Sequence, residues 1–320
     1  MRTVVCAYSA VGHACLAELL DVGADVRLVV THADAPGERI WFDSVAELAR
    51  SAGVRVIAPR DINAPEVVAT IRRVEPELLF SFYFRQMMKA QVLDLATEGA
   101  LNMHGSLLPK YRGRAPVNWV LVNGESETGV TLHYMDEKPD HGDIVAQHLV
   151  PILGKDTALT LTRKLALAGR VLLHEHYPLL AEGVAQRTPQ EHGRASYYGG
   201  RRPEDGRIDW QSSAESIHNL IRAVAHPWPG AFGYFRGRKL IVWRARVDVR
   251  EDQPFPGVVT LEPDGSPRVA TGAGSLILLE VTWEGSPGAT GPAWGRQAQV
   301  GLGEGFDKMD PLVDLVVDSS

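Results

Sequence analysis

Two polar residues about a third of the way along the chain, Asn102 and His104, have the types and the spacing that acyl transfer requires. They are two positions apart at the end of a strand-like run, so their side chains are expected on the same side of that strand. An asparagine amide can donate a hydrogen bond to the oxyanion of a tetrahedral intermediate, and an imidazole can exchange the proton that an attacking amine loses. The pair therefore indicates acyl transfer to an amine.

A carboxylate that orients and charges the imidazole would complete this set. Asp140 is the best candidate, because it lies in the polar loop over residues 135–143, between two strand-like runs. A lone histidine after a strand is more often a structural residue, so Asn102, His104 and Asp140 by themselves leave both interpretations open.

The elements that must position these residues predict an α/β fold. Short β-branched runs alternate with helical patterns through the first half of the chain, which is typical of a Rossmann-like, mostly parallel sheet. Ligands bind at the carboxyl ends of such strands, where Asn102 and His104 lie. We expect strands over residues 4–8, 26–30, 54–57 and 78–82, and helices over 14–20, 44–52 and 65–74.

The first turn of this sheet argues against a classical nucleotide cofactor. Residues 8–13 contain one glycine, whereas the dinucleotide fingerprint G-x-G-x-x-G needs three, and no Walker A sequence follows. The fold is therefore expected to be Rossmann-like without binding NAD or a nucleoside triphosphate.

The second half of the chain changes character. Two extended runs and a long helical pattern are followed by polar, glycine-rich residues and then by short strands between turn signals, which suggests a small OB-like β-barrel. We expect a Rossmann-like catalytic domain over residues 1–186, a linker over 187–207, a C-terminal β-barrel domain over 208–305 and a tail over 306–320.

The composition limits the function further. The formal net charge of −6 gives no global basic field, which argues against a nucleic-acid partner. Two cysteines, the lack of a signal peptide and the lack of an apolar run long enough for a membrane span indicate a cytoplasmic protein that contacts no membrane. No His-x-x-x-His or Cys-x-x-Cys pair occurs, so no metal is expected. The oligomeric state is open.

Four separated segments occur in an order that a known family shares. They are the pattern Asn-x-His-x-Ser-Leu-Leu-Pro over residues 102–109, the pair Arg112-Gly113, a Gly-Val-Thr strand over 129–131 and an Asp-x-Gly loop over 140–142. These segments resemble the folate-dependent formyltransferases, and the likeness extends from the first strand to about residue 305. The resemblance implies an enzyme that moves a formyl group from 10-formyltetrahydrofolate to a primary amine.

The resemblance also implies roles for individual residues. Asn102 and His104 would be catalytic, with a protonated His104 beside the oxyanion, and Asp140 would raise the pKa of His104. The folate would lie against the backbone of Gln86, Met87 and Met88, and its site would be completed by Arg114 and the loop of Asp136, Glu137, Lys138, Pro139 and Asp140.

Within the family, residues 80–85, 105–125, 200–203 and 222–232 are most similar to the modules that formylate UDP-4-amino-4-deoxy-L-arabinose for lipid A modification and polymyxin resistance. A UDP-linked 4-amino sugar, supplied by a separate protein, is therefore the expected acceptor. The paired guanidinium groups of Arg201 and Arg202 suit a diphosphate, although a solvated basic linker explains them equally well.

Other functions remain as alternatives. Methionyl-tRNA formylation is the first and glycinamide ribonucleotide formylation the second, while a non-catalytic folate-binding sensor represents a different class. A tRNA reader should concentrate lysine and arginine on its C-terminal domain. Here a basic stretch over residues 236–250 is followed by acidic residues, so this domain is expected to carry charges of both signs and not a basic surface.

Overall fold

The computed structural model describes residues 1–35, 37–248, 250, 255–301 and 303–307. The chain divides into two compact units. The first contains residues 1–120, 125–154 and 160–200, and the second contains residues 121–124, 155–159 and the described part of 201–320. The segment expected as a linker, 187–207, thus contributes residues to both units. Of the expected tail, residues 308–320 lie outside the described residues.

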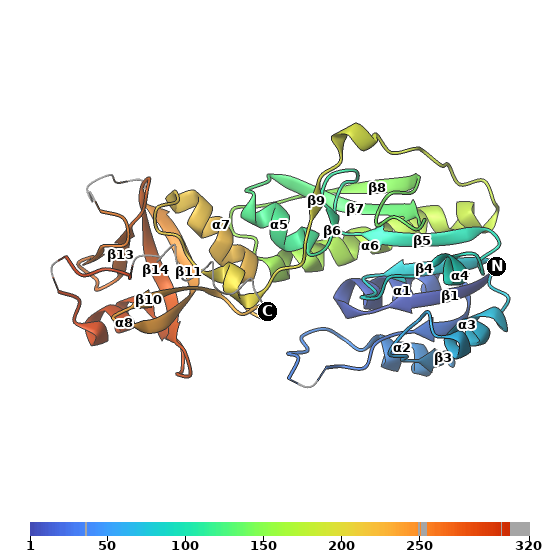
Figure 1. The fold of residues 1–320 in the computed structure, drawn as a ribbon, viewed down its shortest axis with the longest axis horizontal. Coiled ribbons are helices and arrows are strands. Elements are labelled where there is room, and N and C mark those ends of the chain that lie inside the picture. The colour runs from blue at the N-terminus through green and yellow to red at the C-terminus, as the bar shows by residue number, and fades with distance from the viewer. Residues whose placement is uncertain (36, 249, 251–254, 302, 308–320) are drawn as a thin grey trace. The chain divides into compact units, whose positions relative to one another are not determined.

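The first unit is built on one sheet with the strand order β3-β2-β1-β4-β5-β7-β8 (Figure 1). Neighbouring strands from β3 to β5 pair in parallel, whereas β7 is antiparallel to both β5 and β8. The strands are β1 (Arg2–Ala7), β2 (Asp25–Val30), β3 (Arg55–Ile57), β4 (Leu78–Phe82), β5 (Gly99–His104), β7 (Glu127–Tyr134) and β8 (Ile144–Pro151).

Helices cover both faces of this sheet, which explains why its central strands are almost continuously apolar. On one face, Val4 and Cys6 of β1 belong to a buried cluster with residues of α3 and α4. On the other face, Tyr177 of α6 packs near Phe80 of β4, and Arg170 of α6 donates to the buried carboxylate of Glu18 in α1. The helices are α1 (Ser9–Asp21), α2 (Val45–Ser51), α3 (Pro65–Arg72), α4 (Ala90–Leu93), α5 (Pro116–Val122) and α6 (Ala158–Ala181).

A separate pair of short strands lies outside the large sheet. Strands β6 (Arg112–Gly113) and β9 (Tyr197–Tyr198) pair in parallel, and the short 3-10 helix η1 (His192–Arg194) precedes β9. Through this pairing, residues near position 197 contact the loop that follows β5.

The second unit contains an antiparallel sheet with the order β10-β11-β14-β13-β12, to which β15 adds by pairing with β14. The strands are β10 (Ala231–Phe235), β11 (Arg238–Asp248), β12 (Val259–Leu261), β13 (Pro267–Ala270), β14 (Ser275–Trp283) and β15 (Ala289–Thr290), and the helices are η2 (Pro203–Gly206), α7 (Ala214–Val224) and α8 (Gly291–Ala298). A mostly parallel α/β domain followed by a β domain was predicted, and this fold class is confirmed.

The glycine of the Gly-Val-Thr strand has a packing role. A Cβ atom at Gly129 in β7 would lie 2.3 Å from the carbonyl oxygen of His148 in β8 and 2.5 Å from Cδ2 of Leu107. A main-chain carbonyl in a paired strand cannot move aside cheaply. Glycine at this position therefore lets β8 and the loop after β5 approach β7 closely.

We expect Gly129→Ala to lower the free energy of unfolding by about 1–3 kcal/mol, as overpacking a close contact does. The control is Gly154→Ala, because a Cβ at Gly154 would meet no described atom within 4 Å, and its stability should change by less than about 0.5 kcal/mol. Urea unfolding of the two variants measures the difference, and equal midpoints would contradict this account of Gly129.

Candidate active site

The antiparallel pairing of β5 with β7 brings four polar side chains to one face of the sheet. Asn102 lies directly opposite His133, and His104 lies directly opposite Thr131. Directly opposed residues of an antiparallel pair point to the same face, and residues two apart on one strand do so as well. The expected pair Asn102 and His104 therefore faces a second polar pair.

Asp140 reaches this face from the loop between β7 and β8. Its Oδ1 lies 3.4 Å from Nδ1 of His104, 3.5 Å from Nδ2 of Asn102 and 3.6 Å from Nε2 of His133. Its Oδ2 accepts a hydrogen bond from the backbone N–H of Gly113 at 2.8 Å. The structure thus brings together the three residues that the sequence predicted as catalytic.

The protonation states of this pair follow from burial and charge. Burial lowers the pKa of His104 below its ordinary value, and this effect outweighs the opposite effect of Asp140. Burial by itself would raise the pKa of Asp140, but His104, His133 and the N–H of Gly113 hold it well below its usual range. At neutral pH the site therefore contains a neutral imidazole beside an ionised carboxylate.

The effect of Asp140 on the His104 pKa has the direction expected from the sequence, but it is smaller than the effect of burial. Burial has the larger effect because it disfavours the charged imidazole. The Nε2–H of His104 donates to the carbonyl oxygen of Tyr111 at 2.8 Å. In the neutral ring the proton is thus on Nε2, and the lone pair of Nδ1 faces the site.

The sequence interpretation missed His133. Its ring is buried, its Nδ1–H donates to the carbonyl oxygen of Tyr134 at 2.8 Å, and its Nε2 lies 3.2 Å from Nδ2 of Asn102. Nε2 of His133 therefore faces both the Asn102 amide and the Asp140 carboxylate. The alternation of Thr131 and His133 in a predicted strand was the signal that could have placed both residues on the face of the site.

Thr131 holds the loop after β5. Its hydroxyl donates to the carbonyl oxygen of Ser106 at 2.6 Å and accepts from the N–H of Leu108 at 3.1 Å. The side-chain amide of Gln147 in β8 donates to Thr131 and to the carbonyl oxygen of Leu108. The threonine of the Gly-Val-Thr strand thus fixes the backbone that immediately follows His104.

The residues expected to edge the folate differ in their surroundings. The Gln86 side chain accepts from the N–H of Ile62 at 2.7 Å, Met87 is 58% exposed, and Met88 is buried in the core cluster. Within the described part of the chain, the backbone N–H groups of Gln86 and Met88 have no hydrogen-bond partner. Main-chain donors are therefore available there, whereas the side chains of Gln86 and Met88 serve the fold.

The other expected folate residues form an exposed rim. Asp136 accepts from the N–H of Lys138 and pairs with His141, and Glu137, Lys138 and Pro139 are exposed. Arg114 is exposed as well, and its backbone N–H donates to the carbonyl oxygen of Tyr198 in β9. The exposed side chains of Glu137, Lys138, Pro139 and Arg114 can thus contact a ligand, whereas the Asp136 carboxylate is held by Lys138 and His141.

Arg201 and Arg202 belong to the second unit, at the start of η2. The guanidinium of Arg201 donates to the carbonyl oxygen of Asp205 at 2.8 Å, and the backbone N–H of Arg202 donates to the Asp205 carboxylate at 2.6 Å. Burial lowers the pKa of Arg201, and Asp205 opposes this effect. Both arginines are therefore tied to one aspartate.

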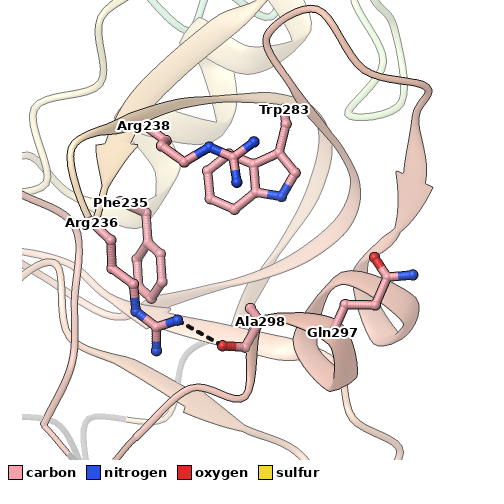
Figure 2. A pocket seen from close by; sticks show the side chains of 6 residues that line it. All are labelled: Phe235, Arg236, Arg238, Trp283, Gln297 and Ala298. Carbon is pink, nitrogen blue, oxygen red and sulfur yellow. Dashed lines mark hydrogen bonds between the residues drawn. The ribbon is translucent and has the colours of Figure 1, made fainter.

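A cavity of about 170 Å³ lies in the second unit (Figure 2). Arg236 is paired there with Glu304 and donates to the carbonyl oxygen of Ala298, while the guanidinium of Arg238 lies 4.5 Å from the centre of the Trp283 ring. None of its six described lining residues is a histidine, cysteine or carboxylate, so the cavity holds no group suited to proton transfer near neutral pH. The candidate active site is therefore the cluster around Asp140.

The described residues contain no candidate metal site and no candidate membrane span. No group of three or more histidine, cysteine, aspartate or glutamate side chains there could hold a metal ion. Likewise, none of the helices over the described ranges is long and apolar enough to cross a membrane.

Family models match both parts of the chain. Residues 5–176 match the model described as Formyl transferase, and residues 201–299 match the model described as Formyl transferase, C-terminal domain. The first match alone covers more than half of the 320 residues. The chain belongs to the formyl transferase family, as the four motif segments predicted.

Solved structures of related fold agree with this family. WlaRD, a sugar 3N-formyl transferase crystallised in the presence of dTDP and 5-N-formyl-THF, has a TM-score of 0.67 at 19% identity over 90% of this chain and 99% of its own. The N-formyltransferase from Helicobacter canadensis, in complex with folinic acid and dTDP-3-aminofucose, has a TM-score of 0.66 at 20% identity over 86% and 98% of the two chains.

HypX from Aquifex aeolicus, in complex with tetrahydrofolic acid, has a TM-score of 0.64 at 17% identity over 97% of this chain. The match covers 49% of the HypX chain, so this chain spans about half the length of that protein. At identities below 25%, the likeness to these three structures demonstrates a shared fold.

The electrostatics of the site can be measured without an activity assay. Because Asp140 opposes the effect of burial, we expect Asp140→Asn to lower the pKa of His104 further. An NMR titration of the histidine ring signals measures the shift. The control is Asp136→Asn, whose carboxylate faces His141 instead. An unchanged or raised His104 pKa in Asp140→Asn would contradict the assignment of Asp140 as the partner of His104.

Proposed function

We propose that the protein transfers a formyl group from 10-formyltetrahydrofolate to the primary amine of a nucleotide-linked amino sugar. The observation that carries this proposal is the buried, ionised carboxylate of Asp140, which lies within 3.5 Å of both Nδ1 of His104 and Nδ2 of Asn102. A proton acceptor (His104), an amide donor (Asn102) and a negatively charged partner (Asp140) thus lie together at one face of one sheet.

The neutral state of His104 defines its proposed role. The lone pair of Nδ1 accepts the proton that the amine loses as its nitrogen bonds to the formyl carbon, and the imidazolium formed is stabilised by Asp140. Asn102 donates its amide N–H to the oxyanion of the tetrahedral intermediate. His104 then returns the proton to the N10 nitrogen of the folate as the bond between N10 and the formyl carbon breaks.

This mechanism revises one expectation from the sequence. A protonated His104 beside the oxyanion was expected, but burial keeps the free imidazole neutral. The cation then forms only after proton transfer, beside Asp140. Positioning and oxyanion stabilisation carry most of the rate in such a reaction.

The proposed folate site uses the main chain of Gln86, Met87 and Met88, the exposed loop over residues 136–140 and Arg114. The free N–H groups of Gln86 and Met88 support this choice, because a pterin ring offers acceptors as well as donors. A guanidinium such as that of Arg114 suits a carboxylate or a carbonyl group of the folate.

For the acceptor we propose a UDP-linked 4-amino sugar, UDP-4-amino-4-deoxy-L-arabinose, with a role in lipid A modification and polymyxin resistance. Sequence resemblance to the formyltransferase module of the bifunctional protein ArnA supports this choice. The dTDP-linked sugar and the dTDP named for two structural relatives support the nucleotide-sugar class. Arg201 and Arg202 are the proposed diphosphate ligands.

The catalytic set can be tested by single and double substitutions. Replacing Asn102, His104 or Asp140 by alanine should reduce kcat at least about 100-fold, as the loss of an oxyanion donor does. Because the three act as one unit, double variants should lose much less than the product of the single effects. His174→Ala is the matched control, since His174 is an exposed histidine on α6. Wild-type turnover in His104→Ala would refute the mechanism.

The acceptor can be identified by comparing rates with UDP-4-amino-4-deoxy-L-arabinose, dTDP-3-aminofucose and methionyl-tRNA at two salt concentrations. We expect the UDP sugar to be formylated with a shallow salt dependence, because one diphosphate is contacted, whereas tRNA binding weakens steeply with salt. Arg201→Ala and Arg202→Ala should raise the acceptor KM more than they lower kcat.

Arg194→Ala is the control for these arginines, because Arg194 is exposed and pairs with Glu191. Formylation of the tRNA without formylation of either sugar nucleotide would overturn the acceptor while leaving the transfer chemistry intact.

A further inference from the structure

The loop after β5 contains a buried cation without a carboxylate partner. Arg112 is 1% exposed, and among the described residues no carboxylate lies within ion-pair distance of its guanidinium. Its Nε and Nη2 donate to Oε1 of Gln190 at 3.2 and 2.6 Å, and its Nη1 donates to the Tyr197 hydroxyl at 2.6 Å. Nη2 also lies 3.0 Å from Nδ1 of His192. All of these partners come from residues 190–197.

The other end of the Gln190 amide faces the turn that carries Asp140. Its Nε2 donates to the carbonyl oxygen of Asp140 at 3.0 Å and to the carbonyl oxygen of Gly142 at 2.7 Å. Gln190 is 6% exposed, and its side chain uses both amide hydrogens and its oxygen. One buried side chain thus joins the loop after β5 to the loop between β7 and β8.

Asp140 needs such support because of its backbone. Its φ of 53° lies in the left-handed region, which costs a residue with a side chain energy and persists only when the surroundings hold it. The N–H of Gly113 holds the carboxylate, and Gln190 holds the main chain on either side of His141. Together these contacts fix both the position and the direction of Asp140.

The same segment also fixes the hydrogen-bond partner of His104. The hydroxyl of Ser196 accepts from the N–H of Tyr111, whose carbonyl oxygen accepts from Nε2 of His104. The pairing of β9 with β6 places the N–H of Gly113 next to Asp140, and a Cβ at Gly113 would lie 2.4 Å from the carbonyl oxygen of Tyr198. Residues 190–198 therefore contact the groups that hold Asp140 and also the groups that hold His104.

We propose that Gln190 is a positioning residue for formyl transfer, whose amide sets the Asp140 carboxylate against Nδ1 of His104. This role rests on the proposed function. It predicts that Gln190 acts through Asp140, so its replacement should change kcat rather than KM and should have no further effect once Asp140 is absent.

Two replacements distinguish the role of the Gln190 amide oxygen from that of its amide nitrogen. Gln190→Glu keeps the acceptor for Arg112 and adds a charge partner, but it removes both donors to the turn and places a carboxylate against two carbonyl oxygens. Gln190→Met removes every hydrogen bond at nearly the same volume. Glu191→Gln is the matched control, because the neighbouring Glu191 is exposed and pairs with Arg194.

The decisive experiment is a double-mutant cycle. Gln190→Met and Gln190→Glu should each lower kcat about 10–100-fold with KM changed less than about threefold, the scale of a small misplacement of a reacting group. In an Asp140→Ala background, Gln190→Met should lower kcat less than about twofold further. A purely structural role would reduce turnover by the same factor in both backgrounds, and that result overturns the proposal, as does wild-type kcat in Gln190→Glu.

A second measurement does not depend on turnover. His104 is faced by Asp140, His133 and Arg112, and of these only Asp140 raises its pKa. Gln190→Met introduces no charge, so an NMR titration should show a lower His104 pKa than in the wild type. An unchanged His104 pKa together with a reduced kcat in Gln190→Met rejects the positioning role. If the wild-type protein itself transfers no formyl group, only the proposed function is rejected.

Discussion

The site depends on keeping one carboxylate ionised while it is nearly buried. An isolated carboxylate in such a place would take up a proton, because burial penalises its charge. Asp140 stays ionised because a main-chain N–H donates to one oxygen, and His104, His133 and Asn102 surround the other. These partners come from three parts of the fold, so the ionised carboxylate links β5, β7 and the loop after β5 into one arrangement.

The change from parallel to antiparallel pairing within the sheet makes this arrangement possible. In a purely parallel sheet, ligands meet residues from the loops that follow neighbouring strands. Because β7 is antiparallel to β5, Asn102 and His104 instead face His133 and Thr131 within a strand. Thr131 then fixes the backbone after His104, and Nε2 of His133 lies against the Asn102 amide. Side chains within β7, and not only residues at the ends of strands, thus belong to the site.

The sequence predicted the fold class and brought Asn102, His104 and Asp140 together, because their types, their spacing and the Gly-Val-Thr strand are local signals. It could not predict the neutral state of His104, since the net pKa depends on burial that only the packed structure defines. The sequence also could not predict the role proposed for Gln190. Its polar, glycine-rich neighbourhood suggested a linker, whereas its role comes from contacts with residues about 50 and 78 positions away.

The residues proposed to carry formyl transfer are all in the first unit, and this limits what the motif can specify. In the proposed mechanism, Asp140, His104 and Asn102 act on the amine nitrogen and the formyl group, and these atoms are the same whichever molecule carries the amine. Selection among acceptors must therefore come from residues outside the four motif segments. The proposed diphosphate ligands Arg201 and Arg202 lie outside these segments and directly follow the boundary of the first unit at residue 200. The chemistry and the acceptor can consequently change independently in this fold, so the family match identifies the reaction more closely than the substrate.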